Sequence, residues 1–258
     1  MNKLELNVLQ ITDTHIFVDP ADRLGGMDTS ASFQRILNLV LDSQIRFDLV
    51  LLTGDLAAES EAGAYHWLIE KLARLNTRVA CIPGNHDVAT MMEPIVCAAG
   101  WHYCGDIIAS QWHVILLDSA VPGAAYGALR DSELHRLERS LSAHLGMPTI
   151  VVLHHNPVPM DSRWIDTMTL KNTDAFWAVI DRHIQVRCVA WGHVHQNYDS
   201  YRNGVRLLAT PSTCVQFEAR SRDFAQARLE PGFRHLRLSA DGELSTRVVR
   251  LAKDHGQG

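Results

Sequence analysis

Short clusters of Asp, Asn and His residues recur along the chain, each at the end of an apolar run. There are five: Asp13-Thr14-His15, Gly54-Asp55, Gly84-Asn85-His86-Asp87, His154-His155 and Gly192-His193-Val194-His195. If the chain is still extended there, residues two apart point to the same side, so paired ligands converge on one point. Carboxylate, amide and imidazole ligands without cysteine suit manganese, iron or zinc. Several imidazoles are more than magnesium or calcium normally accepts.

Each cluster alone has an ordinary structural explanation. Asp-x-His and Gly-Asp are common in surface turns, and Asn85 or Asp87 could cap a helix. His154 and His155 could be a core pair, and Gly-His-Val-His could be a turn. Five such clusters in this order, each after a strand, are hard to explain as independent accidents. Because ligands bind at the carboxyl ends of strands in open α/β sheets, we expect a metal site there.

The elements that must position these clusters follow from the apolar pattern. Runs rich in Val, Ile and Leu predict strands at 6–12, 49–53, 78–82, 113–118, 149–153 and 186–191. Between them, apolar residues at helical spacing predict helices around 33–41, 68–75 and 134–141. Strands that alternate with helices indicate βαβ units around a buried sheet.

The last quarter of the chain has a different pattern. Strands are predicted at 198–202, 205–209, 234–238 and 244–249, and Asn203-Gly204 and Asp241-Gly242 are strong hairpin signals. We therefore expect one α/β domain over residues 1–258, a two-sheet mixed β sandwich flanked by helices. The C-terminal strands from about residue 196 are expected to complete the second sheet.

The charge, the apolar segments and the cysteines of the chain argue against several classes of protein. A net charge of −5 gives no global basic footprint for nucleic acid. Glu5 and Asn7 interrupt any apolar run at the start, so no signal peptide is expected, and no stretch approaches the roughly 18 apolar residues of a membrane span. The five cysteines lack Cys-x-x-Cys spacing, which is typical of thiols in a reducing compartment. We expect a cytoplasmic protein.

The five clusters resemble the calcineurin-like metallophosphoesterase superfamily, whose pattern is Asp-x-His, Gly-Asp, Gly-Asn-His-Asp/Glu, His and Gly-His-x-His. Within it, the chain is most similar to bacterial class III cyclic-nucleotide phosphodiesterases. That similarity extends to the segments 9–15, 83–87, 116–119 and 207–217. The resemblance implies the metallophosphoesterase type of fold.

The resemblance also implies a ligand set. One metal would be held by Asp13, His15, Asp55 and His195, and the second by Asp55, Asn85, His154 and His193. Asp55 would bridge the two ions, and His155 is the alternative to His154. The implied cofactors are two ions per chain, iron and/or manganese, with zinc or cobalt as substitutes.

The implied reaction is hydrolysis of 3',5'-cyclic AMP to AMP by in-line attack of a hydroxide that bridges the metals. His86 would protonate the departing oxygen. The residues expected to contact substrate are His15, Asp55, Asn85, His86 and His195. Asp87 would orient the His86 loop or cap a helix, and Arg163 or Trp164 could contact the base.

Two other functions stay open at this point. One is a broad phosphodiesterase acting on glycerophosphodiesters or other small diesters, and the other is a scaffold without activity. A scaffold is expected to lack a ligand or His86, and this chain has all of them. The expected partner is a small cyclic nucleotide, with no nucleic acid, no membrane and a possible homodimer.

Overall fold

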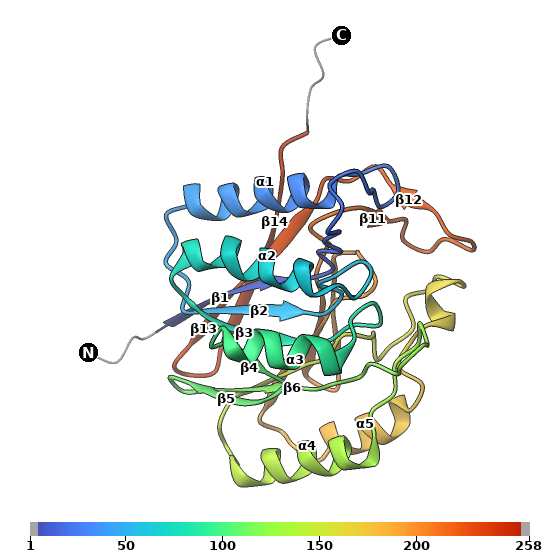
Figure 1. Cartoon of the computed structure of the whole chain (residues 1–258). Helices are drawn as coiled ribbons and strands as arrows, with labels where there is room; N and C mark the ends of the chain where they lie inside the picture. Colours follow the sequence, from blue (N-terminus) through green and yellow to red (C-terminus); the bar gives the residue numbers. More distant parts are fainter. Residues whose placement is uncertain (1–4, 254–258) are drawn as a thin grey trace.

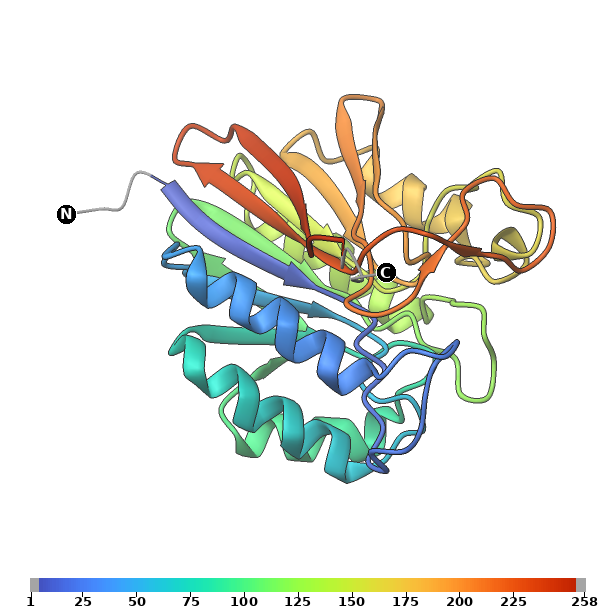
Figure 2. The same cartoon turned by 90° about the horizontal axis from the view of Figure 1, so that it is seen from above.

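Two six-stranded sheets pack face to face, and helices cover both outer faces (Figures 1 and 2). The computed structural model describes residues 5–253. Figure 2, seen from above, separates the layers: helices α1 to α3 lie on one side of the sandwich, and α4 and α5 lie on the other. The layer order is therefore helix, sheet, sheet, helix.

The first sheet has the strand order β14-β13-β1-β2-β3-β4. Its strands are β1 (Glu5–Ile11), β2 (Leu49–Thr53), β3 (Arg78–Ile82), β4 (His102–Tyr103), β13 (Gly232–Ser239) and β14 (Leu244–Arg250). Strands β1 to β4 are parallel, whereas β13 pairs antiparallel with β1, and β14 pairs antiparallel with β13. Its helices are α1 (Thr29–Asp42), α2 (Ala62–Leu72), the short η1 (Ala73–Leu75) and α3 (Ala89–Ala98).

The second sheet has the order β5-β6-β7-β8-β10-β9. Its strands are β5 (Gly105–Ala109), β6 (Trp112–Leu116), β7 (Thr149–Val152), β8 (Val186–Trp191), β9 (Tyr198–Arg202) and β10 (Val205–Ala209). The elements around it are α4 (Asp131–Ala143), η2 (Ile165–Thr167) and α5 (Thr173–Ile180), with a separate ribbon of β11 (Gln216–Phe217) and β12 (Gln226–Ala227).

An apolar core between the sheets holds the sandwich together. Leu51 and Ile82 of the first sheet and Leu116, Val152 and Ala190 of the second all belong to it and are fully buried. The central parallel strands are covered on both faces, which is why they read as continuous apolar runs. The β2 arrow in Figure 1 points to the end of the sandwich where the polar clusters follow the strands.

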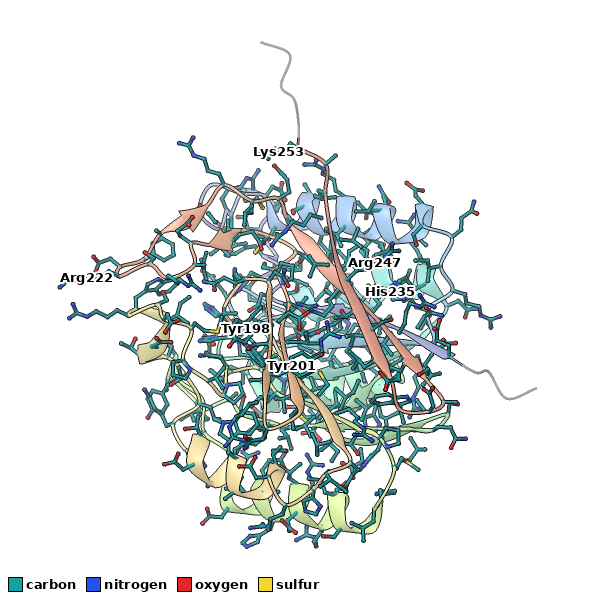
Figure 3. The ribbon with its side chains drawn as sticks, turned by 180° about the vertical axis from the view of Figure 1, so that it is seen from behind. Tyr198, Tyr201, Arg222, His235, Arg247 and Lys253 are labelled. Carbon is teal, nitrogen blue, oxygen red and sulfur yellow. The ribbon has the colours of Figure 1, made fainter. Side chains whose placement is uncertain are left out.

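The predicted fold class is confirmed. Five of the six strands predicted in the first 191 residues lie within one residue of their observed limits, and the sixth, predicted at 113–118, ends two residues earlier, at Leu116. One expectation is wrong in part, because the strands after residue 196 divide between the sheets. Strands β9 and β10 extend the second sheet, but β13 and β14 extend the first. Figure 3 shows this from behind, with Tyr198 and Tyr201 on β9, and His235 and Arg247 on β13 and β14.

Helices α3 and α5 were not predicted from the sequence. Helix α3 contains Pro94, and α5 is only eight residues long, so neither gives a long periodic signal. Among the described residues, no helix is long and apolar enough to cross a membrane.

The contact between α4 and the second sheet can be tested with Leu137, which is fully buried there. Leu137→Ala is expected to lower the free energy of unfolding by about 2–5 kcal/mol, because it removes buried methyl groups and leaves a cavity. Leu145→Ala, at a residue that is 74% exposed, is the control and is expected to cost less than about 0.5 kcal/mol. Urea unfolding measures both, and equal losses would contradict this packing.

Candidate metal centre

Five strands deliver the polar clusters to one end of the sandwich. The loops after β1, β2, β3, β7 and β8 carry all seven residues predicted as metal ligands. Groups of their ligand atoms lie within 4.8 Å of one another: Asp13, His15 and His195; Asp13, Asp55 and His154; His15, Asp55 and His86; and His154, His155 and His193. The amide oxygen of Asn85 lies 3.3 Å from Nε2 of His154.

The backbone at these clusters is not extended, so the condition under which residues two apart would point to the same side is not met. Asp13, His15, Asp55, His193 and His195 all have positive φ, between 43° and 65°. Non-glycine residues rarely adopt this left-handed conformation, which costs about 1–3 kcal/mol when the surroundings impose it. The side chains therefore converge through tight turns after the strands and not through the alternation of a strand.

Backbone carbonyl oxygens fix the orientation of two of the imidazole rings. Nδ1 of His154 lies 2.8 Å from the carbonyl oxygen of Thr53, and Nδ1 of His195 lies 2.8 Å from that of Val215. A carbonyl oxygen can only accept, so both Nδ1 atoms carry a proton and donate it. In each neutral ring, Nε2 is then left with a bare lone pair. This arrangement is typical of metal-binding histidines.

Those lone pairs face oxygen atoms that also need a positive partner. Nε2 of His154 lies 3.3 Å from Oδ2 of Asp55, and Nε2 of His195 lies 3.3 Å from Oδ1 of Asp13. Nε2 of His195 is also 3.2 Å from Nε2 of His15. The buried Nε2 of His193 has no hydrogen-bond partner among residues 5–253. With the rings neutral, acceptors gathered in this way repel one another unless a positive charge lies among them. Without metal a proton on His154 supplies such a charge, and a bound cation would displace it, so the donor set fits metal ions.

Protonation of the site is set by burial and by the two carboxylates. Burial lowers the pKa values of His15 and His193 to about 3, so both rings are neutral at pH 7. Burial alone would also lower the pKa of His154, but the carboxylate of Asp55 outweighs it and raises this pKa to about 9. The imidazoles around Asp55, in turn, hold its pKa well below the usual value despite its burial.

Asp87 ties two of the ligand loops together. Its carboxylate accepts hydrogen bonds from the backbone N–H groups of Leu56, Ala57 and Gly84, and from the hydroxyl of Tyr65. It does not cap α3, which begins without a side-chain cap. The structure therefore favours the loop-orienting interpretation of Asp87. Sequence reasoning missed Tyr65, whose position in α2 gives no polar signal.

Two glycines let the loops approach closely. A Cβ on Gly84 would lie 2.1 Å from Oδ1 of Asp55 and 2.4 Å from its backbone nitrogen. A Cβ on Gly192 would lie 2.0 Å from Oγ1 of Thr12 and 2.8 Å from Oδ2 of Asp13. Neither position has room for any other residue.

His86 lies at the exposed mouth of the cluster. Its backbone N–H donates to Oδ1 of Asp55 at 2.8 Å, and its ring packs edge-on against His15 with 4.8 Å between centroids. Nδ1 of His86 donates to the carbonyl oxygen of Ala58 at 3.1 Å. The hydrogen bond to Ala58 therefore does not involve the other ring nitrogen, Nε2.

Of the two adjacent histidines, His154 contacts the two oxygen ligands predicted for the second ion. His155 is turned toward Ser119, with 2.9 Å between Nδ1 and Oγ, although its ring is also 4.7 Å from that of His193. The contacts to Asp55 and Asn85 favour His154 for the second ligand set. A ligand atom of His155 also lies within 4.8 Å of those of His154 and His193, so His155 stays the alternative.

An aromatic cluster supports His195 on the other side. Phe217 stacks on the His195 ring with 4.0 Å between centroids and 11° between planes, and Trp164 packs edge-on against Phe217. Sequence reasoning singled out Trp164 but missed Phe217. In the structure, Trp164 contacts Phe217 and Phe224, and Arg163 is exposed.

The close approach of Gly84 to Asp55 can be tested by Gly84→Ala. The added methyl group has no space beside the Asp55 backbone, so the Asp55 loop must move, and the protein is expected to bind less than half as much metal per chain. Gly100→Ala is the control, because an added Cβ there would meet no atom of the described part of the chain within 4 Å, although the φ of Gly100 is +80°. This control is expected to lose some stability and no metal. Elemental analysis of both folded variants measures the difference, and full metal content in Gly84→Ala would contradict the packing.

Comparisons with known proteins agree with this geometry. Residues 6–197 match the family model described as calcineurin-like phosphoesterase. The chain is 38% identical to a 3',5'-cyclic adenosine monophosphate phosphodiesterase, CpdA, of Vibrio vulnificus, over 98% of this chain and 92% of that protein. It is 39% identical to the CpdA of Escherichia coli, over 96% and 90% of the two chains.

Among solved structures, a dimetal phosphatase from Danio rerio has a similar fold. The TM-score is 0.66 at 13% sequence identity, over 96% of this chain and 99% of the other. At this identity the likeness concerns the fold alone. The family match and the two phosphodiesterases carry the assignment, and the chain belongs to the calcineurin-like phosphoesterase family.

Proposed function

We propose that this protein is a two-metal phosphodiesterase that hydrolyses 3',5'-cyclic AMP to AMP. The observation that carries the proposal is the convergence of carboxylate oxygens and imidazole lone pairs from five separate loops on one buried cluster. The substrate is proposed from the relatives described above, which are named as phosphodiesterases of this nucleotide and match nearly the whole chain.

The seven residues divide into two ligand sets. Asp13, His15, Asp55 and His195 would hold one ion, and Asp55 with Asn85, His154 and His193 would hold the other. Iron and manganese suit this mixture of oxygen and nitrogen donors. Bound ions would supply positive charge to the phosphoryl oxygens and lower the pKa of water.

Electrostatics explains why a phosphodiester would need those ions. Asp13 and Asp55 have pKa values below the usual range, so both are charged at neutral pH. Two carboxylates would repel the anionic diester at this short range. The same carboxylates hold cations, so the bound ions would turn a repulsive cluster into one that attracts the substrate.

His86 is proposed as the acid that protonates the leaving oxygen. Because Nδ1 donates to the Ala58 carbonyl, the imidazolium form can donate a proton only from Nε2. The bond from its backbone N–H to Asp55 keeps the ring beside the carboxylate that is shared by both ligand sets. Hydrogen bonds to Asp87 hold the loops on either side of this contact.

Further properties stay predictions from the sequence. These are a single domain over residues 1–258, a cytoplasmic location, a possible homodimer and iron or manganese as the native metals. The core shared by both sheets supports the first, and the five free cysteines support the second.

The substrate can be tested with a panel of cyclic AMP, cyclic GMP, glycerophosphocholine and bis(p-nitrophenyl) phosphate, using protein loaded with manganese. Cyclic AMP is expected to give a kcat/KM at least about tenfold above the others, which corresponds to about 1.4 kcal/mol of transition-state discrimination. Similar rates on all four diesters would favour the broad phosphodiesterase instead. No hydrolysis of any of them, with two ions bound, would contradict the reaction itself.

His86→Ala tests the acid. It is expected to lower kcat by about 10²- to 10⁴-fold, because one proton transfer loses its donor, while two ions per chain remain bound. His66→Ala, which changes an exposed histidine of α2, is the control and is expected to keep full activity. An unchanged kcat in His86→Ala would remove this residue from the mechanism.

Metal affinity is expected to depend on pH through His154. A ligand imidazole must be neutral, and this ring stays protonated below its pKa of about 9. The apparent association constant for Mn²⁺ should therefore rise about tenfold per pH unit between roughly pH 6 and 8, because loading displaces one proton from this ring. Isothermal titration calorimetry in buffers of different ionisation enthalpy measures the proton release. An affinity that is independent of pH would contradict the protonated state of His154.

A further inference from the structure

A cavity opens directly beside the metal cluster. It has a volume of about 410 Å³ and lies between the loop after β3, which includes Asn85, and the loop after β6, which includes Val121. Asn85 is shared between the cavity and the cluster, because its amide oxygen faces His154. A phosphodiester bound at the cluster would therefore have its substituent at the mouth of this cavity.

The lining of the cavity suits a flat, largely apolar group. Val88 and Ala89 lie where the first sheet's loop passes into α3, and Val121 comes from the second sheet's loop. Val88 is 44% exposed, so it leaves a large apolar side chain uncovered next to the candidate metal centre. The volume lies at the small end of the range of about 300–1,000 Å³ for sites that bind small molecules.

The wall of the cavity also has a polar pair. Asp118 is 9% exposed, and its Oδ2 accepts a hydrogen bond from Nη2 of Arg130 at 2.7 Å. Its Oδ1 accepts a hydrogen bond from the backbone N–H of Ala120 at 3.0 Å. A carboxylate has about four acceptor positions, so Asp118 can still accept from an amino group in the cavity. The other carboxylate of the lining, Asp87, already accepts from three backbone N–H groups and the Tyr65 hydroxyl. Asp118 in this partly apolar slot would therefore select a ligand with a donor at its edge.

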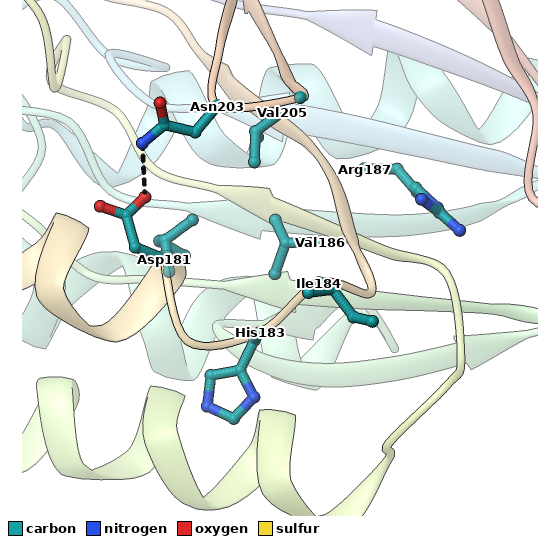
Figure 4. Close-up of a pocket in the computed structure, with 9 residues that line it drawn as sticks. Asp181, His183, Ile184, Val186, Arg187, Asn203 and Val205 are labelled. Atoms are coloured by element: carbon teal, nitrogen blue, oxygen red, sulfur yellow. Dashed lines mark hydrogen bonds between the residues drawn. The ribbon is translucent and has the colours of Figure 1, made fainter.

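Two other places are less suitable for such a group. The cavity of Figure 4, between Asp181, Ile184 and Asn203, lies at the amino end of β8, whereas the metal cluster follows its carboxyl end. On the His195 side of the cluster, Phe217 already stacks on the imidazole, so no base can enter between them.

We propose that the cavity between the Asn85 and Val121 loops binds the nucleoside part of the substrate, with the amino group of the base directed to Asp118. This inference rests on the proposed function, since it assigns the part of the same substrate that the metals do not hold. The apolar loops would cover the faces of the base, and the cavity would contribute to selection of nucleotides over simple diesters.

The test uses Ala89→Trp, at the start of α3, and Val121→Trp, in the loop after β6, which fill the cavity from its two sides. Ala98→Trp is the matched control: it adds the same ring to an exposed position at the other end of α3, about 13 Å away along the helix. The ratio of kcat/KM for cyclic AMP to kcat/KM for methyl p-nitrophenyl phosphate is measured for each manganese-loaded protein. The ratio is expected to fall at least tenfold in the two cavity variants and to stay constant in the control. A constant ratio in a folded cavity variant would overturn the proposal.

A second measurement separates this inference from the proposed reaction. Inhibition of aryl diester hydrolysis by AMP and by inorganic phosphate is compared in the unaltered protein, whether or not cyclic AMP is hydrolysed. AMP is expected to inhibit at least tenfold more tightly than phosphate, and the cavity variants are expected to lose this preference. Equal inhibition constants would overturn the nucleoside site. If cyclic AMP is not hydrolysed but AMP is preferred, the nucleoside site stands and the proposed reaction fails.

Discussion

Two hydrogen bonds from imidazole rings to backbone carbonyl oxygens govern the chemistry of this protein. His154 and His195 each donate from Nδ1 to the backbone, so each turns an unprotonated Nε2 toward a carboxylate in the neutral form. The carbonyl acceptors belong to Thr53, at the end of β2, and to Val215, just before β11. The secondary structure thus sets the tautomer, and the tautomer makes the cluster a place for cations.

The left-handed turns at the ends of the strands raise the free energy of the folded backbone, and contacts with the neighbouring structure must offset this strain. Five of the seven proposed ligands have positive φ. Asp87 helps to hold one part of this strained region, because it receives three backbone N–H groups and the Tyr65 hydroxyl. Burial of a carboxylate without such partners would be expensive. Asp87 and the strained loops are therefore parts of one arrangement, in which buried hydrogen bonds offset backbone strain.

Much of the fold could be predicted from the sequence, and the reason is physical. The parallel strands are covered on both faces, so Leu49–Thr53 and Arg78–Ile82 read as continuous or nearly continuous apolar runs with sharp ends. The division of the last strands between two sheets could not be predicted, because β13 pairs with β1 across more than 200 residues of chain and leaves no local signal.

The candidate site divides in the same way. Its residue types and their positions after strands could be predicted from the clusters, and the structure brings all seven residues together. The geometry of the turns could not be predicted from the sequence, because Asp-x-His is compatible with both extended and left-handed backbone. Supporting residues such as Tyr65 and Phe217 contact the ligands from distant elements. Their roles depend on packing that one sequence does not reveal.

The position of β13 against β1 has a consequence for how much of the chain is needed. Strand β1 leads to Asp13 and His15, and it has β2 on one side and β13 on the other. The family match ends at residue 197, well before β13 begins at Gly232. In a polypeptide shortened to that match, β1 would become an edge strand. Its backbone amide and carbonyl groups would then be unpaired on one side and could pair with another chain, which leads to self-association. All the proposed metal ligands come from the first 195 residues, yet they could not be excised as a minimal enzyme.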